Sequence, residues 1–144
     1  PWTPWGSTPP AAATGRPMMN TSTAPGRTVW VIAEGYIPSA STGDGRAFES
    51  HETACILNAG DEDAQVEITL YFSDREPAGP YRVTVPARRT LHQRFNDLND
   101  PEPVPRDTDY ASLLAADRPV IVQHTRLDSR QAALALLSTE AYGE

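Results

Sequence analysis

The stretch PVIVQHTRLDSRQ, residues 119–131, decides the fold class of this chain. It begins with β-branched residues and then turns polar without any helix signal, which predicts an extended strand. Side chains alternate across a strand, so His124, Arg126 and Asp128 share one face. Side chains two residues apart lie about 6.6 to 6.8 Å from one another, a spacing that suits a small polar ligand held between them. The alternative interpretation is an edge strand whose charges satisfy one another.

Similar extended segments precede this stretch, and the clearest alternation places Val66, Ile68, Leu70 and Phe72 on one side of a strand. Turn residues separate the other extended segments, which are residues 26–38, 50–60, 81–85, 88–95 and 108–119. The segment at residues 108–119 is predicted to end in a turn. Residues 132–142 fit either a helix or a strand by pattern alone. Seven or eight short strands and no long amphipathic helix predict an all-β fold, an antiparallel β-sandwich.

The chain has 144 residues with 14 prolines and 9 glycines, which suits one domain with many turns. Residues 1–26 are rich in proline, threonine and alanine without apolar periodicity, which predicts a flexible tail. Residues 27–144 are predicted to form the β-sandwich domain, which is large enough to bury a core without disulfides or metal.

Charge and cysteine content restrict the partners and the compartment. The net charge of −7 argues against general nucleic-acid binding. Cys55 is the single cysteine and cannot form an internal disulfide, which fits the reducing cytoplasm. No apolar segment approaches the length of about 20 residues that spans a bilayer. We therefore expect no direct membrane insertion, and any contact with a membrane to pass through a partner.

Three segments are apolar on both faces, namely residues 29–33, 54–57 and 120–122. A strand of a two-sheet sandwich normally buries one face and exposes the other to water. Something should therefore cover the outer faces. A second copy of the chain is the favoured cover, which predicts a homo-oligomer; the alternative cover is the loop at residues 96–108 or the tail.

Signatures of catalysis and of metal binding are missing from the sequence. The three histidines and the nearby carboxylates do not follow a known metal-ligand spacing. Cys55 lies between apolar residues, where a thiol is typically inert packing. No GxSxG, P-loop or GxGxxG motif occurs. The sequence therefore predicts a protein that is not an enzyme and has no metal or cofactor.

Aromatic and charged residues on the strand faces suggest a site for a sugar or another small polar ligand. Trp30 and Glu34 share a face and combine ring stacking with a hydrogen-bonding carboxylate, although core packing explains Trp30 equally well. Arg89 lies on the apolar side of its strand. We therefore expect it to be buried and to face Glu34, Glu52 or an anionic ligand.

The polar side of the same strand carries Arg88, His92 and Arg94. These side chains suit contacts with DNA phosphates or with an acidic protein surface. A solvated face without a partner is the default interpretation.

Five strings of the sequence resemble the sensory rhodopsin transducer family. They are GRTVWVIAEGYIP at 26–38, SHETACILNAGDEDAQVEIT at 50–69, PYRVTVPARRT at 80–90, RFNDLNDPEPVPRDTDYAS at 94–112 and VIVQHTRLDSRQAALALLSTEAY at 120–142. The resemblance implies a β-sandwich that assembles as a cytoplasmic homotetramer, and it implies that the last segment is a strand. It also implies a microbial sensory rhodopsin as partner, with sugar or DNA binding suggested for related proteins.

The resemblance covers the domain but assigns no catalytic residues. The positions that match the family strings and are also predicted to line one pocket are Trp30, Glu34, His51, Glu52, Asn58, Arg89, His124, Arg126 and Asp128. The first hypothesis is a non-enzymatic signal-transduction protein that docks on a partner or binds a small polar ligand. The alternatives are a sugar- or metabolite-binding module unrelated to any photoreceptor, and a DNA-binding regulator.

Overall fold

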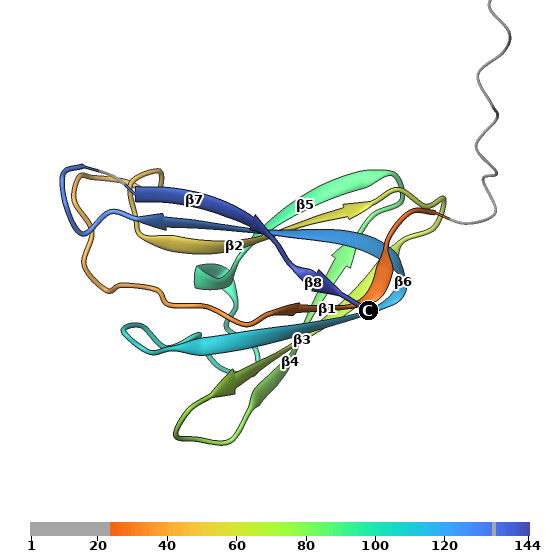
Figure 1. Cartoon of the computed structure of the whole chain (residues 1–144), viewed down its shortest axis with the longest axis horizontal. Coiled ribbons are helices and arrows are strands. Elements are labelled where there is room, and N and C mark those ends of the chain that lie inside the picture. The colour runs from red at the N-terminus through yellow and green to blue at the C-terminus, as the bar shows by residue number, and fades with distance from the viewer. Residues whose placement is uncertain (1–23, 134) are drawn as a thin grey trace, which may run out of the picture.

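The computed structural model describes residues 24–133 and 135–144, so most of the expected tail at residues 1–26 lies outside the described residues. The described chain forms strands and a single 3₁₀ helix, and every strand pair is antiparallel (Figure 1), which confirms the predicted all-β fold. The elements are β1 Arg27–Ile32, β2 His51–Asn58, β3 Ala64–Phe72, β4 Ala78–Val85, β5 Arg89–Arg94, η1 Phe95–Asp97, β6 Tyr110–Asp128, β7 Ala135–Glu140 and β8 Tyr142–Gly143. The ambiguous last segment is therefore extended, as the family resemblance implied.

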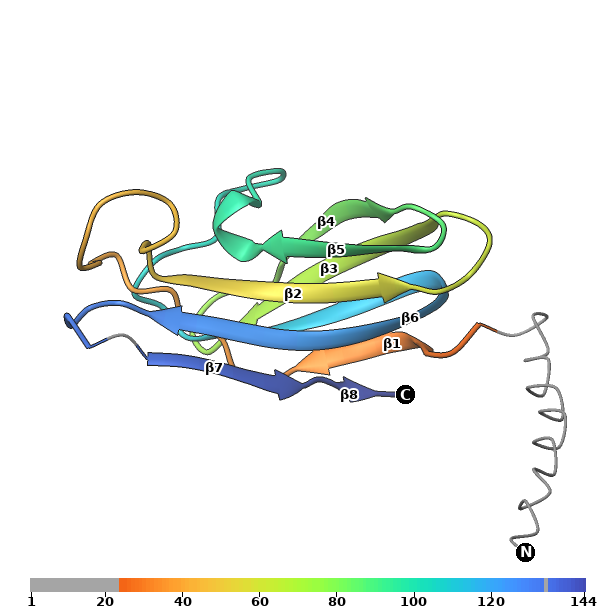
Figure 2. The ribbon, with the colours of Figure 1, turned by 90° about the horizontal axis from the view of Figure 1, so that it is seen from above.

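Strand β6 organises the molecule because it belongs to both sheets. Its first half pairs with β3 and β1, and its second half pairs with β2 and β7. One sheet has the order β4-β3-β6-β1-β8, and in the other β2 lies between β5 and β6. In Figure 1 the two halves of β6 form the arms of a wedge that is closed at the right, with η1 between the arms; Figure 2 shows the same strands from above.

The turn expected at the end of residues 108–119 is instead a bend inside β6. The register with β1 pairs Val29 with Ala115 but Arg27 with Val120, so β6 carries extra residues at this point. Extra residues of this kind bend a strand, and Pro119 cannot donate a ladder hydrogen bond. The strand therefore changes sheets without ending.

The core lies between the two arms of the wedge. β3 alternates as predicted, with Val66, Ile68 and Leu70 buried and Glu67 exposed. Burying a side chain of this size stabilises the fold by about 1.5 to 3 kcal/mol. The largest buried side chains are Tyr81, Phe95, Ile37, Ile56, Ile68, Leu70 and Leu114.

Strand β1 is shorter than the segment predicted at residues 26–38, because the chain leaves the sheet after Ile32. The next residues cross towards the start of β6, where the Tyr110 N–H donates a hydrogen bond of 2.9 Å to the Gly35 carbonyl. A Cβ atom at Gly35 would lie 2.5 Å from the Tyr110 ring, so this close approach requires glycine. Glu34 is thereby held beside the inner face of β6.

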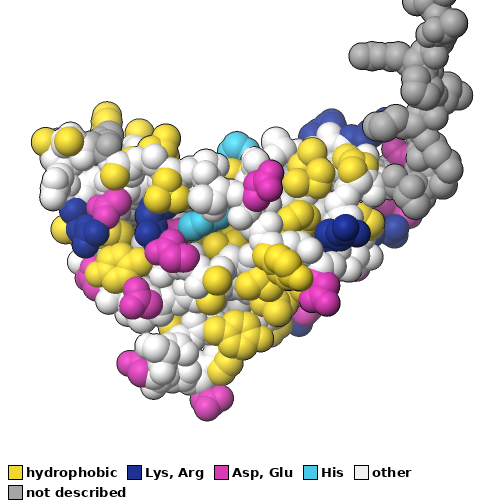
Figure 3. All heavy atoms as spheres, viewed as in Figure 1, with side chains coloured by type: hydrophobic (Ala, Val, Ile, Leu, Met, Phe, Trp, Pro, Cys, Tyr) yellow, Lys and Arg dark blue, Asp and Glu magenta, His cyan; other side chains and the backbone are white. Residues whose placement is uncertain are grey.

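Apolar side chains also lie on the outer faces of the sheets, as the two-sided segments suggested. Val31 and Ile121 are half-buried, and Leu57 is 40% exposed. In Figure 3 apolar side chains gather over β1, β3 and β8, where Tyr142 is 67% exposed. None of the helical structure in the described ranges has the length and apolar character of a membrane span.

Candidate functional site

A cluster of charged side chains forms on the inner face of β2 and β6, near the open end of the wedge. The register places Arg126 directly opposite Glu52, and His124 lies two residues before Arg126 on β6, opposite Ala54. Residues at these positions point to the same side of a sheet. The cluster therefore follows from the alternation predicted for residues 119–131, once the β2–β6 register is known.

Glu52 is the centre of the cluster, and its side chain is only 1% exposed. Its Oε1 accepts hydrogen bonds from Arg126 Nε at 2.5 Å and from the Tyr36 N–H at 3.0 Å. Its Oε2 forms a hydrogen bond with His124 Nε2. A buried carboxylate is tolerated only when its oxygens are paired in this way.

Arg126 connects this buried centre to the surface. Its Nη2 donates to Glu34 Oε1 at 2.5 Å, and the side chains of Arg126 and Glu34 are 18% and 63% exposed. Burial by itself would lower the pKa of Arg126, but the hydrogen bonds and charges of Glu52 and Glu34 raise it above its ordinary value. Arg126 is therefore a fixed cation between two carboxylates.

Tyr110 adds a hydroxyl group that the sequence analysis missed. This hydroxyl is buried and has no hydrogen-bond partner among the residues described. Burial, followed by the negative charge of Glu52, raises the pKa of Tyr110 well above its ordinary value. The only signal in the sequence was the alternation of Tyr110, Ser112 and Leu114, which places all three on the inner face of β6.

The cluster is suited to hydrogen bonding rather than to metal binding. No group of three or more metal-ligating side chains occurs within residues 24–133 and 135–144. Arg126 already supplies the positive charge that a cation would bring to Glu34 and Glu52. Beyond these ion pairs, the exposed Glu34 offers a second carboxylate oxygen to a polar molecule, whereas the Tyr110 hydroxyl is enclosed by the protein.

The structure brings together four of the predicted ligand-binding residues and separates the others. The four are Glu34, Glu52, His124 and Arg126. Trp30 instead donates from Nε1 to the Val120 carbonyl at 2.9 Å, which ties β1 to the bend of β6. It is packed against the core, as its alternative interpretation held.

Asn58 and Arg89 lie opposite each other at the far end of β2, away from the cluster. Asn58 is buried and donates to the Glu62 and Val85 carbonyls, so it holds the turn between β2 and β3. The expectation of a buried Arg89 was wrong, because this residue is the first of β5 and is exposed there. Its Nη1 donates only to the neighbouring Arg88 carbonyl, at 2.9 Å, among the residues described.

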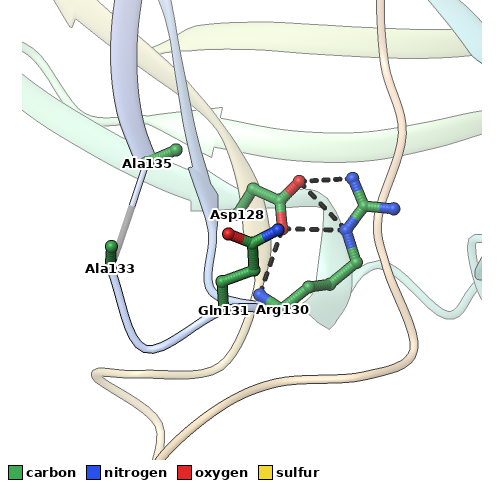
Figure 4. Close-up of a pocket in the computed structure, with 5 residues that line it drawn as sticks. All are labelled: Asp128, Arg130, Gln131, Ala133 and Ala135. Atoms are coloured by element: carbon green, nitrogen blue, oxygen red, sulfur yellow. Dashed lines mark hydrogen bonds and ion pairs between the residues drawn. The ribbon is translucent and has the colours of Figure 1, made fainter.

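Asp128 lies at the end of β6 and pairs with Arg130, whose Nη2 is 2.6 Å from Asp128 Oδ2. This hydrogen bond is the main reason why the pKa of Asp128 is lowered. Figure 4 shows both side chains at a cavity of about 590 Å³ that Gln131, Ala133 and Ala135 also line. Asp128 is thus part of a neighbouring surface feature, not a member of the Glu52 cluster.

The remaining predicted residues lie on outer surfaces. His51 alternates with Glu52 and therefore points out of the sandwich, where its Nδ1–H donates to the Glu49 carbonyl at 2.8 Å. His92 and Arg94 lie on the same outer face, opposite Cys55 and Thr53 of β2. Arg88 is exposed in the preceding turn.

Comparison with known proteins gives consistent matches across the domain. The sequence model of the family Anabaena sensory rhodopsin transducer matches residues 25–143. A solved structure of Anabaena sensory rhodopsin transducer is 66% identical over 72% of this chain and 100% of its own, with a TM-score of 0.67. A crystal structure of Thermotoga maritima 1070 is 33% identical over 83% of this chain and 96% of its own, with a TM-score of 0.74. No curated protein matches the chain.

Proposed function

The chain belongs to the Anabaena sensory rhodopsin transducer family, and from that premise we propose that it is a non-enzymatic signal-transduction protein that docks on a partner. A sensory rhodopsin is the first candidate partner, because a relative with 66% identity carries that name. The observation that supports this function best is the family match over residues 25–143, which includes every strand described.

The charge of the molecule supports docking on a basic surface in the cytoplasm. Cytoplasmic loops of membrane proteins are rich in Lys and Arg, and this chain has a net charge of −7. The turn 73–77 and the loop 96–109 meet through the Arg75–Glu102 ion pair of 2.7 Å. Together these two segments form an acidic end with Asp74, Glu76, Asp97, Asp100, Glu102, Asp107 and Asp109.

Retention of the purified protein on an immobilised sensory rhodopsin in detergent tests this function. We expect retention that weakens as salt is added, because the attraction is between exposed charges. Asp100→Lys together with Asp109→Lys should reduce it, whereas the matched pair Asp61→Lys with Glu62→Lys, in the turn between β2 and β3, should not. Equal retention of both variants would contradict docking through the acidic end, and no retention at any salt would contradict the rhodopsin partner.

A second function, binding of a small polar ligand such as a sugar, is supported by the exposed Glu34 carboxylate and the ion pair that it forms with Arg126 at the edge of the Glu52 cluster. A neutral polyol can both donate and accept hydrogen bonds without disturbing the existing ion pairs. In a thermal-shift screen, a ligand at a hundred times its dissociation constant stabilises the fold by about 2.7 kcal/mol. Glu34→Ala should reduce such a shift, because Glu34 is the exposed member of the cluster, and a flat screen over sugars and small acids would contradict this function.

We also propose that the protein works as a cytoplasmic homo-oligomer, with a tetramer as the favoured assembly. Partly exposed apolar side chains on the outer sheet faces, such as Val31 and Tyr142, support a covering copy. Light scattering after size exclusion measures the mass, and Val31→Asp should reduce it. A monomer at micromolar concentration would contradict the assembly.

DNA binding through Arg88, His92 and Arg94 remains the less favoured alternative. The net charge of −7 opposes the approach of a polyanion. If DNA binds there, its affinity should fall steeply as salt is added.

A further inference from the structure

A second cavity lies on the outer face of the β2–β5–β6 sheet, on the opposite side from the Glu52 cluster. The cross-strand register aligns Thr53 with Arg94 on β5 and with Thr125 on β6, and it aligns Cys55 with His92. Neighbouring strands lie about 4.8 Å apart, so these side chains form a continuous patch. This outer pocket has a volume of about 380 Å³ and is lined by Arg46, His51, Thr53, Cys55, His92, Arg94 and Thr125.

Two arginines line the outer pocket, Arg46 and Arg94, and only Arg46 has an ion pair among the described residues. Arg94 is half-buried, and its one hydrogen bond among the described residues goes to the neutral Arg46 carbonyl, at 2.9 Å. Arg46 itself is held at the rim by two hydrogen bonds to Asp97, of 3.0 and 2.5 Å. Among the described residues no carboxylate lines the pocket, although the nearby Asp97 carboxylate interacts with the charge of Arg94 as well as with that of Arg46. The guanidinium of Arg94 keeps further N–H groups available to an anion.

Hydrogen-bonding groups of the other lining residues also face this space. The Nδ1–H of His51 donates to the Glu49 carbonyl, so in the neutral ring its Nε2 can only accept a hydrogen bond, for example from a hydroxyl group of a ligand. Thr53 and Thr125 supply hydroxyl groups, and the Thr125 hydroxyl lies 3.8 Å from Cys55 Sγ. A guanidinium combined with hydroxyl groups is a typical set of phosphate ligands.

We propose that the outer pocket binds a small phosphate monoester, a function that goes beyond docking on a partner. Its volume is at the lower end of the range of about 300 to 1,000 Å³ for small-molecule sites. A polymer of phosphates would extend beyond the pocket and be repelled by the net charge of −7, whereas a small ester responds mainly to charges within about 8 Å. The pocket therefore suits a phosphorylated metabolite better than a nucleic acid.

Cys55 provides a direct measurement, because it is the only cysteine of the chain and lines the outer pocket. Its rate of alkylation by iodoacetamide is followed with glycerol 3-phosphate, with inorganic phosphate, and with glycerol or sodium chloride at matched ionic strength. We expect glycerol 3-phosphate to slow alkylation about tenfold at ten times its dissociation constant, since about one pocket in eleven is then empty. Inorganic phosphate should protect at higher concentration, and the two controls should not protect.

A matched pair of variants tests whether the protection arises in this pocket. Arg94→Gln should raise the concentration needed for half-protection at least about tenfold, through loss of a charge-assisted hydrogen bond. Arg82→Gln should not change it, because Arg82 pairs with Glu67 on the outer face of the other sheet. Protection is compared with the unprotected rate of each variant, so a change in thiol reactivity does not affect the result.

Three outcomes would overturn the phosphate ester as ligand. They are no protection by glycerol 3-phosphate, equal protection by sodium chloride, and tighter protection by inorganic phosphate than by the ester. Wild-type behaviour of Arg94→Gln would overturn the assignment of the site. If Arg94→Gln does not fold by circular dichroism, Thr125→Val replaces it as the test variant, because it removes a lining hydroxyl at constant shape.

Discussion

The two halves of β6 are stabilised by different physical means. In the first half Leu114 is buried against apolar residues of β3 and β1. In the second half Val120 and Val122 still belong to the apolar core, but the next inward residues, the buried His124 and the half-buried Arg126, pack against the carboxylate of Glu52. One continuous strand therefore joins an apolar half to a half that ends in a polar cluster.

The comparison shows that the polar half depends on complete pairing. Burial of an apolar side chain stabilises the folded state wherever water is excluded. A buried ion pair adds little net stability, because desolvation of the charges offsets their attraction. Removal of one member of the pair leaves the remaining charge buried without a partner. The polar half should therefore be sensitive to the loss of any one member, and its retention in the fold is better explained by a function than by stability.

The largest effect is expected from Glu52→Ala, which leaves the buried His124 and the half-buried Arg126 without their shared carboxylate. The free energy of unfolding should fall by about 3 to 5 kcal/mol. Urea denaturation followed by circular dichroism measures this change.

A triple variant, Glu52→Leu with His124→Leu and Arg126→Met, provides the control for Glu52→Ala. Replacing a whole buried charge cluster by apolar side chains is often neutral or stabilising. We therefore expect the triple variant to unfold at higher urea than Glu52→Ala does. If it is the less stable of the two, the contrast between the halves of β6 fails.

Leu114→Ala tests the apolar half and should cost about 2 to 5 kcal/mol, through lost burial and the cavity left behind. The Glu52 cluster is retained in this variant, so any ligand that binds at the cluster should keep its affinity. Urea denaturation measures the stability of the variant, and the thermal-shift titration measures its ligand affinity on the same sample. A parallel loss of affinity would show that the two halves are coupled.

Alkaline pH should act through Tyr110, the first residue of β6, whose folded-state pKa is raised by burial. Tyrosines of the unfolded chain ionise near pH 10, while Tyr110 of the folded chain stays protonated. The free energy of unfolding should therefore fall as the pH rises above about 10. Tyr110→Phe should make this fall shallower, with a remainder from Tyr81, whose pKa is also raised by burial. An unchanged slope in Tyr110→Phe would contradict this account.

Glu34→Gln should have the smallest effect, because Glu34 is exposed and Arg126 keeps its ion pair with Glu52. Exposed ion pairs contribute about 0 to 1 kcal/mol and are weakened by salt. Denaturation at low and high salt measures this contribution. A loss as large as that of Glu52→Ala would place Glu34 in the buried part of the cluster.

Strand alternation was sufficient to predict the fold class and the inward position of His124 and Arg126. It did not predict their partner, because Glu52 lies 74 residues before Arg126 in sequence and only the β2–β6 register brings the two together. The sequence offered Glu52 as a partner for Arg89 instead. The side of the strand predicted for Arg89 agrees with its register opposite Asn58, but burial also depends on how far the sheet extends, which alternation does not specify.

The bend at Pro119 shows a similar limit. Proline and its polar neighbours signal a break in a strand, and a turn and a bend share that local signal. The first half of β6 pairs with β1 and the second half pairs with β2, and these two pairings keep the strand continuous through a bend. These contacts are distant in sequence, so local residue preferences could not reveal them.

The position of β6 after β1 to β5 in the sequence has a consequence for biosynthesis. Until β6 has been synthesised, only the β2–β5 and β3–β4 pairs can form, since β1 pairs with β6 and β8 alone. Each nascent chain therefore exposes unpaired strand edges until β6 has been made. Such edges are prone to association, and we expect the nascent polypeptide to depend on chaperones up to that moment.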